Sequence, residues 1–347
     1  MGNFTGKLNA NEIFGALYNM IISQEVFADN IKGSDLVDQA RVEGSLYGDQ
    51  KFFYSTDALE SAEWGNDAEA TNLLAIKRPE DPKCQTITLD VFRQISLTLD
   101  NYLSKRAWSD EGAFSAFNSV MQGWLKDTKK VYDGTLYNCY IGTTETAIGS
   151  QTKKVSAEVA ADAKQLAATI ADIITEMTDY NRDYNDYHQL KRCSESDLKI
   201  IFNSKYVNRI MNVDLPVIFD NAGLKGTFSK EYLPARYFGT VNVPKKIADA
   251  KTRSLIEQTI NHVHYFAGDK IKEGDEAPAG TSYQEDDKII AKIMIKLPPY
   301  MSAFEVGTSF FNPKSLTENH YLTFGHNTIE YLKAYPFVTI KISDQNN

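Results

Sequence analysis

ARVEGSLYGDQKFFYSTD (residues 40–57) and QTITLDVFRQISLTLDNYLSKRAW (residues 85–108) are the two stretches that decide how this chain folds. The first lies in a segment from residue 36 to about residue 82 that is rich in turn-forming Gly, Asn and Asp and carries an acidic patch. A segment of this composition buries little of its own side-chain surface. We therefore interpret it as a long excursion away from the hydrophobic core.

The second stretch reads as the return limb of that excursion. Polar and apolar residues alternate from Gln85 to Leu89, and Ile95, Leu97 and Leu99 continue the same period of two, which is the period of a half-buried strand. The pattern predicts two successive strands or one long bent strand. Because an isolated two-stranded hairpin is only marginally stable in water, we expect the resulting arm to lie on another surface.

The bulk composition indicates a globular protein with room for one large or two smaller cores, since 42% of the 347 residues are hydrophobic. The formal net charge of -9 excludes the usual strongly basic class of nucleic-acid binder. We find no secretory signal pattern and no apolar run as long as a membrane span, and expect a protein made in a cytoplasm without membrane contact. Cys84, Cys139 and Cys193 form no C-x-x-C pair and are expected to be buried thiols.

Three stretches have helical spacing. A short amphipathic helix is expected from Leu8 to Phe27. From Ser109 to about Val131, bulky apolar residues recur every three or four positions and predict a helix with an aromatic face. A longer pattern from about Val155 to Tyr187 predicts a helix roughly 45 Å long. Between the last two, Tyr137 to Ile141 is predicted to be a short strand.

The later part of the chain has an α/β pattern. LKIIFNSKYVNRI (residues 198–210) predicts a buried strand from Leu198 to Phe202, a cap at Asn203 or Ser204 and a short helix. Residues 268–287 are rich in Gly, Asp, Glu and Pro and predict an exposed loop. The alternating runs 288–297 and 336–342 predict strands.

His262 and His264 are the one close pair of histidines. On a strand both rings would point to the same face, as two ligands of a metal ion require, but the third ligand is missing. The chain also lacks a Gly-x-Ser-x-Gly nucleophile motif, a P-loop and a dinucleotide fingerprint. We therefore expect no enzyme activity, no cofactor and no bound metal, and keep a metal-dependent enzyme using His262 and His264 as an alternative.

The order of these segments resembles the major capsid proteins of tailed bacteriophages, which have the Hong Kong 97-type fold. Residues 40–57 resemble the outgoing limb of that family's extended loop, and residues 85–108 resemble its return. Residues 111–130 would be the spine helix. LKIIFNSKYVNRI resembles the strand-then-helix element of the axial domain, and MSAFEVGTSFFNPKSLTENHYLTFGH (residues 301–326) resembles a late segment of such proteins.

The resemblance implies an α+β fold of the Hong Kong 97 type, with an N-arm, an extended β-hairpin loop, a peripheral domain with a spine helix, and an axial α/β domain. The implied divisions are 1–35 for the N-terminal arm, 36–90 for the extended loop, 91–150 for the peripheral domain with its spine helix, 151–300 for mainly the axial domain, and 301–347 for C-terminal strands that return to the peripheral or axial sheet.

The implied function is that of a major head protein, which self-assembles into pentamers and hexamers of an icosahedral shell around double-stranded DNA. An encapsulin-like compartment shell of the same fold is the alternative. The implied partners are the protein itself, with scaffolding, portal and decoration proteins, and the contact with packaged DNA would be weak. The implied location is the virion capsid, assembled in the cytoplasm of a bacterial host.

We expect the contacts between subunits to involve bulky and basic side chains of the extended loop, because such a turn-rich segment cannot form a core of its own. The residues concerned are Arg41, Tyr47, Lys51, Phe52, Phe53 and Trp64.

Overall fold

The computed structural model describes residues 31–45, 48–61, 78–100, 111–144, 151–206, 229–242, 258–260, 263–265 and 282–343. The helices in this part of the chain are α2 (Asp35–Ala40), α4 (Glu111–Thr143), α5 (Ala157–Ala161) and α6 (Ala163–Thr178), with two short 3-10 turns, η2 (Glu195–Asp197) and η3 (Ala235–Tyr237). The helix expected from Leu8 to Phe27 lies outside the described residues.

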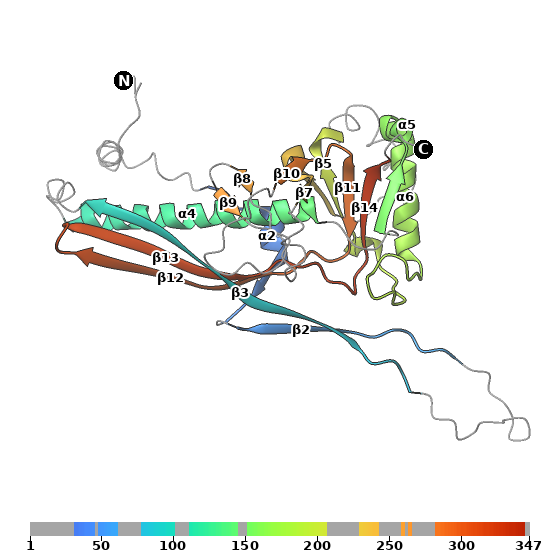
Figure 1. Ribbon diagram of the computed structural model, residues 1–347, viewed down its shortest axis with the longest axis horizontal. Coiled ribbons are helices and arrows are strands. Elements are labelled where there is room, and N and C mark those ends of the chain that lie inside the picture. The colour runs from blue at the N-terminus through green and yellow to red at the C-terminus, as the bar shows by residue number, and fades with distance from the viewer. Residues whose placement is uncertain are drawn as a thin grey trace, which may run out of the picture.

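The first sheet has the strand order β1-β12-β13-β3-β2. Its strands are β1 (Arg41–Glu43), β2 (Gln50–Ser55), β3 (Lys83–Asp100), β12 (Tyr300–Asn312) and β13 (Thr317–Asn327). The return limb is one long strand, because β3 runs unbroken through 18 residues, about 60 Å at the usual rise per residue. Its first six residues pair with β2 and the remainder pairs with β13 (Figure 1).

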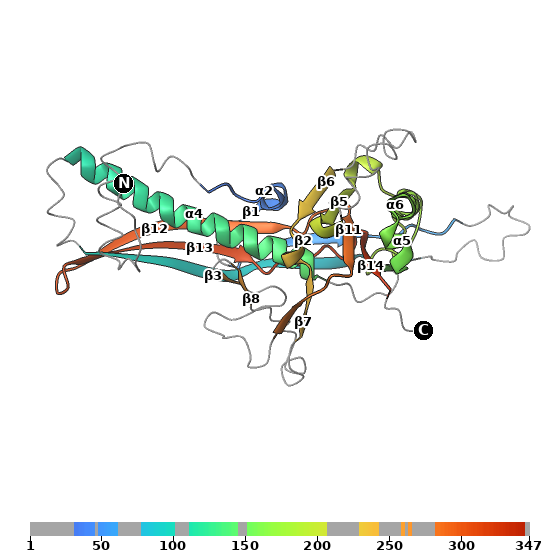
Figure 2. The same cartoon turned by 90° about the horizontal axis from the view of Figure 1, so that it is seen from above.

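Helix α4 lies along one face of the first sheet (Figures 1 and 2). It confirms the helix expected after Ser109 and continues to Thr143, so the strand predicted from Tyr137 to Ile141 is wrong. This end of α4 is buried around almost its whole circumference, and a helix without a polar face loses the amphipathic pattern that distinguishes it from a strand. Gly142 permits the close packing, since a Cβ atom there would lie 1.8 Å from the carbonyl oxygen of Tyr237.

The second sheet has the strand order β4-β14-β11-β5-β6. Its strands are β4 (Thr152–Val155), β5 (Lys199–Asn203), β6 (Ser229–Leu233), β11 (Ile289–Met294) and β14 (Phe337–Ile342). β5, β11 and β14 confirm the three strands predicted in this region, and all six residues of the central strand β11 are buried. Asn203 caps the helical turn that follows β5, because its side-chain oxygen accepts a hydrogen bond from the Lys205 backbone N–H at 3.0 Å.

Two short antiparallel pairs complete the described strands. β7 (Gly239–Asn242) pairs with β10 (Ser282–Glu285), and β8 (Gln258–Ile260) pairs with β9 (Val263–Tyr265). β10 lies inside the stretch 268–287 that was predicted to be an exposed loop, so that prediction is wrong for Ser282–Glu285, where pairing with β7 supplies order that the polar sequence does not indicate.

The single helix predicted from about Val155 to Tyr187 is also wrong. Val155 ends strand β4, α5 and α6 are separate helices, and α6 ends at Thr178. The break is at Asp162, whose backbone is extended (φ -95°, ψ 112°) and whose side chain accepts a hydrogen bond from the Lys164 N–H at 2.9 Å. The helical period itself is real, because the apolar face of α6 packs on the second sheet in a separate core.

A buried charged group fixes α4 on the first sheet. The Nζ atom of Lys129, a residue only 5% exposed, lies 3.0 Å from Asp133 on the same helix and 2.7 Å from Glu305 on β12. Asp133 also accepts a hydrogen bond from the Tyr300 hydroxyl at 2.7 Å. The two buried charges, Lys129 and Asp133, are therefore paired with each other and Lys129 also with the exposed Glu305, which is the condition under which charges are tolerated in a protein interior.

His326 of β13 lies beside this group and is uncharged at neutral pH. Its Nδ1 atom is 2.8 Å from the carbonyl oxygen of Asn327, which can only accept, so Nδ1 carries the proton. Nε2 then accepts a hydrogen bond from the Tyr132 hydroxyl of α4 at 3.0 Å. Burial lowers the pKa of His326 below its ordinary value of 6.5.

The lowered pKa predicts a loss of stability on acidification. Below about pH 6.5 the unfolded state binds a proton at this histidine while the folded state does not. The free energy of unfolding therefore decreases as the pH is lowered. We expect the unfolding temperature to drop between about pH 7.5 and about pH 5.5, and to drop less in His326→Gln, as calorimetry of both proteins would measure. Equal drops would show that His326 does not contribute.

Candidate functional site

The β2–β3 hairpin extends the first sheet beyond the body of the subunit (Figure 1). β2 pairs antiparallel with the start of β3, from Gln50 opposite Thr88 to Ser55 opposite Lys83. Figure 1 shows these strands, in blue and teal, leaving the body of the subunit toward the lower right. We call residues 50–88 the arm. Because cross-strand partners share a face of the sheet, the arm has an outer and an inner face.

The outer face of the arm exposes two aromatic rings. Phe52 is 53% exposed and Tyr54 is 69% exposed, and the two rings stack with their centroids 6.3 Å apart. Their cross-strand partners, Thr86 and Cys84, are also exposed, so the prediction of a buried thiol is wrong for Cys84. None of the four side chains carries a formal charge. Exposed apolar surface of this kind marks a site of interaction with another molecule.

The inner face of the arm rests on the subunit's own body. Three of its residues are buried: Ser55, Gln85 and Ile87. The Gln85 amide group donates a hydrogen bond to the carbonyl oxygen of Tyr331 and accepts one from the Lys333 N–H, each at 2.9 Å. The ammonium group of Lys296 lies 5.9 Å above the ring of Phe53. These contacts hold the base of the arm without using its outer face.

Asp57 makes the outermost contact between the arm and the body in the described residues. Its carboxylate pairs with Arg182 and accepts a hydrogen bond from the Leu190 N–H at 2.8 Å. The Arg182 guanidinium and this N–H lower the pKa of Asp57 to about 2, so the carboxylate is ionised at neutral pH. Every described residue farther along the arm, 58–61 and 78–82, is exposed, so this part of the arm buries almost nothing against its own subunit.

Of the residues predicted to make contacts between subunits, the structure brings Lys51, Phe52 and Phe53 together on β2. Only Phe52 faces outward, while Lys51 and Phe53 are half-buried on the inner face. Tyr54 was not among the predicted residues, although it is the more exposed of the two rings. The signal that could have found it is the period of two, which places Phe52 and Tyr54 on the same face of a strand.

The other three predicted residues are not part of the described hairpin. Arg41 lies on β1, which pairs parallel with β12, and its guanidinium is 3.5 Å from the carboxylate of Asp38. Tyr47 and Trp64 lie outside the described residues.

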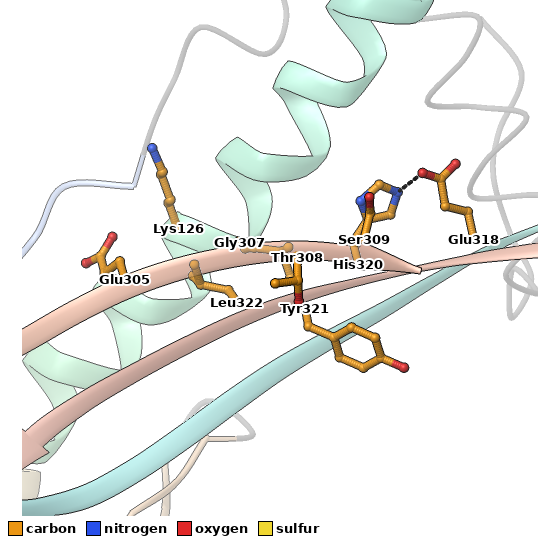
Figure 3. A pocket seen from close by; sticks show the side chains of 10 residues that line it. Lys126, Glu305, Gly307, Thr308, Ser309, Glu318, His320, Tyr321 and Leu322 are labelled. Atoms are coloured by element: carbon orange, nitrogen blue, oxygen red, sulfur yellow. Dashed lines mark ion pairs between the residues drawn. The ribbon is translucent and has the colours of Figure 1, made fainter. Parts of the chain in front are cut away.

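A second candidate is a cavity of 420 Å³ between α4 and the outer half of the β12–β13 hairpin (Figure 3). It is lined by Leu125, Lys126, Glu305, Gly307, Thr308, Ser309, Glu318, His320, Tyr321 and Leu322. Nε2 of His320 lies 3.7 Å from Glu318, which is beyond hydrogen-bond length. Glu305 is already paired with Lys129. This cavity therefore lacks the bonded nucleophile and base that covalent catalysis requires.

The histidine pair is only partly described by the structure. His262 lies outside the described residues, and His264 pairs with Thr259 through the backbone of β9 and β8. Across the part of the chain that the structure describes, no three His, Cys, Asp or Glu side chains are grouped so that they could hold a metal ion. Among the described helices, none combines the length and the apolar composition that crossing a membrane requires.

Most of the chain matches the model of a known protein family. Residues 3–341 match the family model of the Phi29-like phage major capsid protein. No curated protein matches the chain.

Solved structures show the same mixed α+β fold. One chain in the capsid structure of Staphylococcus phage Andhra has a TM-score of 0.66 at 11% identity, over 98% of this chain and 89% of that chain. One in the structure of the head fiber and inner core protein of native bacteriophage P68 has a TM-score of 0.63 at 12% identity, over 97% and 88%. One in the capsid of Ralstonia phage GP4 has a TM-score of 0.51 at 9% identity, over 99% and 97%.

Proposed function

The chain belongs to the Phi29-like phage major capsid protein family, and from that premise we propose that its copies assemble, as pentamers and hexamers, into an icosahedral shell that encloses double-stranded DNA. A member of this family is a structural protein and not an enzyme, and its place in a capsid implies association with itself. The observation that carries the proposal is the arm, which presents Phe52 and Tyr54 to solvent and whose described residues beyond Asp57, 58–61 and 78–82, are all exposed.

The proposed subdivision follows the Hong Kong 97-type plan, with 1–35 as the N-terminal arm, 36–90 as the extended loop, 91–150 as the peripheral domain, 151–300 as mainly the axial domain and 301–347 as the C-terminal strands. Two core clusters support it: one joins α4 to the first sheet and to part of the second sheet, and the other packs α6 on the second sheet. In this plan α4 is the spine helix, and the C-terminal segment supplies β12 and β13 to the peripheral domain and β14 to the axial domain. Within 36–90, α2 packs on α4, and the projecting part begins at β2.

The proposed contacts between subunits are the six residues predicted from the sequence, Arg41, Tyr47, Lys51, Phe52, Phe53 and Trp64, together with Tyr54. Phe52 and Tyr54 are the strongest candidates, because aromatic side chains that become fully buried dominate the energy of protein interfaces. We propose that the outer face of the arm lies on a neighbouring copy.

The remaining proposals concern partners and location. A net charge of -9 supports a shell wall that contacts the packaged DNA weakly, because a strongly basic wall would hold it. Scaffolding, portal and decoration proteins are the proposed further partners, and the proposed place of assembly is the cytoplasm of the bacterial host. An encapsulin-like compartment remains the alternative, and the two differ in what the shell contains.

Electron microscopy of the overexpressed, purified chain tests the proposal. We expect closed shells, tubes or rings of capsomers in negative stain, because the arm can bury its aromatic face only against another copy. Monomers alone at high protein concentration would contradict it. Particles from phage-infected cells should contain DNA, and particles with a protein cargo in its place would favour the compartment alternative.

A further inference from the structure

The segment that holds the base of the arm is a preformed loop. Residues 179–191 follow α6, and the backbones of Asn181 and Lys191 close the loop with two hydrogen bonds of 3.1 and 3.0 Å. Inside it, the fully buried Asn185 side chain donates to the carbonyl oxygen of Gln189 at 2.8 Å and accepts from its N–H at 3.0 Å. We call residues 179–191 the socket loop. None of these bonds involves the arm, so the loop keeps its shape independently of it.

The socket loop is joined to the body of the subunit. The Asp186 N–H donates a hydrogen bond to the carbonyl oxygen of Lys333, and the Phe337 N–H at the start of β14 donates one to the carbonyl oxygen of Tyr184, both at 2.9 Å. The position of the socket loop is therefore fixed relative to the second sheet, and so is the position of a segment bound to the loop.

The arm enters the socket loop at Ser55 and Asp57. Lys191 donates a hydrogen bond to the Ser55 hydroxyl at 3.1 Å, and the Gln189 amide donates one to the Ser55 carbonyl oxygen at 3.3 Å. Arg182 pairs with Asp57 and also donates a hydrogen bond to the carbonyl oxygen of His188 at 3.0 Å. One guanidinium group thus joins the arm to the backbone of the loop.

Because this ion pair lies at the base of the arm, a small change of direction there would cause a large displacement farther along the arm. The 23 residues from 58 to 80, if doubled back in extended form, could reach at most ~35 Å beyond Asp57. A change of about 10° in direction at Asp57 would move a tip at that reach by ~6 Å. A displacement of that size exceeds a side-chain contact distance, so the geometry at Asp57 decides where the arm meets a neighbour.

We propose that Asp57 and Arg182 are positioning residues of the arm: their ion pair fixes the direction in which the arm leaves its own subunit, and that direction sets the curvature and the size of the shell. This inference rests on the proposed function, because it concerns how the arm is aimed and not whether it joins subunits.

The test compares shells formed by Asp57→Ala, Arg182→Ala and the double variant with shells of the unaltered chain. We expect each single variant to form particles whose spread of diameters is about twofold wider, together with tubes and open forms. The spread of the double variant should be no wider than that of either single variant, as for two residues that act as a unit. Arg182→Lys keeps the charge and should restore much of the uniformity. Asp287→Ala is the control, because it removes another surface ion pair between an acidic and a basic side chain, with Lys205, that does not touch the arm.

The outcomes separate the two proposals. Shells of Asp57→Ala and Arg182→Ala as uniform as those of the control would overturn the inference and leave the proposed function intact. Absence of shells from the unaltered chain would overturn the proposed function itself. If Asp57→Ala fails to fold, as its unfolding temperature would show, Arg182→Ala and Arg182→Lys decide the matter, because Arg182 lies on the surface and leaves no buried group unpaired.

Discussion

Replacing residues 59–79 with a short Gly-Ser turn is expected to abolish shells while the subunit stays folded. The described residues removed by this change, 59–61 and 78–79, are all exposed, and no described residue of either core is removed. β2, the first part of β3 and the contacts of Asp57 with the socket loop remain. On the proposed function, the change removes the length of chain with which the arm would reach an adjacent copy.

Two measurements on the shortened chain check this prediction. Its unfolding temperature should stay within a few degrees of the unaltered value, since surface changes away from packed residues alter stability by about 0.5 kcal/mol or less. Analytical ultracentrifugation and microscopy should show small species where the full chain forms shells. Shells from the shortened chain would refute the role given to the arm.

Replacing both Phe52 and Tyr54 with Asp is expected to have the second large effect, a loss of assembly. Loss of an aromatic anchor at the centre of an interface costs about 2 kcal/mol or more, which is ~30-fold in the association constant of each contact. The new carboxylates add the cost of burying unpaired charge. A shell repeats this contact in every subunit, so we expect no assembly at concentrations where the unaltered chain assembles fully.

The matched control for that variant is Phe52→Tyr with Tyr54→Phe, which exchanges the two rings and keeps both faces of the hairpin. It should assemble normally. Light scattering as a function of protein concentration measures both variants on one scale. If the Asp variant assembles at the same concentration as the control, the outer face of the arm is not the contact surface.

The local patterns of the sequence predicted the elements in which one pattern dominates. The alternation of polar and apolar residues through Gln85–Leu89 and onward predicted β3, and the apolar runs after Leu198 and Pro336 predicted β5 and β14. The patterns failed where the environment is unusual. Tyr137–Ile141 belongs to the end of a helix that is buried on almost all sides, and Asp162 divides a continuous helical pattern by capping α6.

The candidate site was predicted in outline but not in its detail. The turn-rich composition of residues 36–82 indicated an excursion, and Phe52, which the structure exposes on β2, was among the residues predicted to make contacts. The pairing of Asp57 with Arg182 could not be predicted, because these residues are 125 positions apart and neither belongs to a local motif. Contacts of this kind arise from the packing of the socket loop, which no short stretch of sequence encodes.

The central claim is that the arm exists to hold an adjacent copy of the chain. A cryo-electron microscopy map of the assembled shell, detailed enough to place side chains, tests this claim most directly. The account predicts that Phe52 and Tyr54 of each subunit are buried against a neighbour. A map in which both rings remain in solvent, or in which the arm folds back over its own subunit, would contradict it.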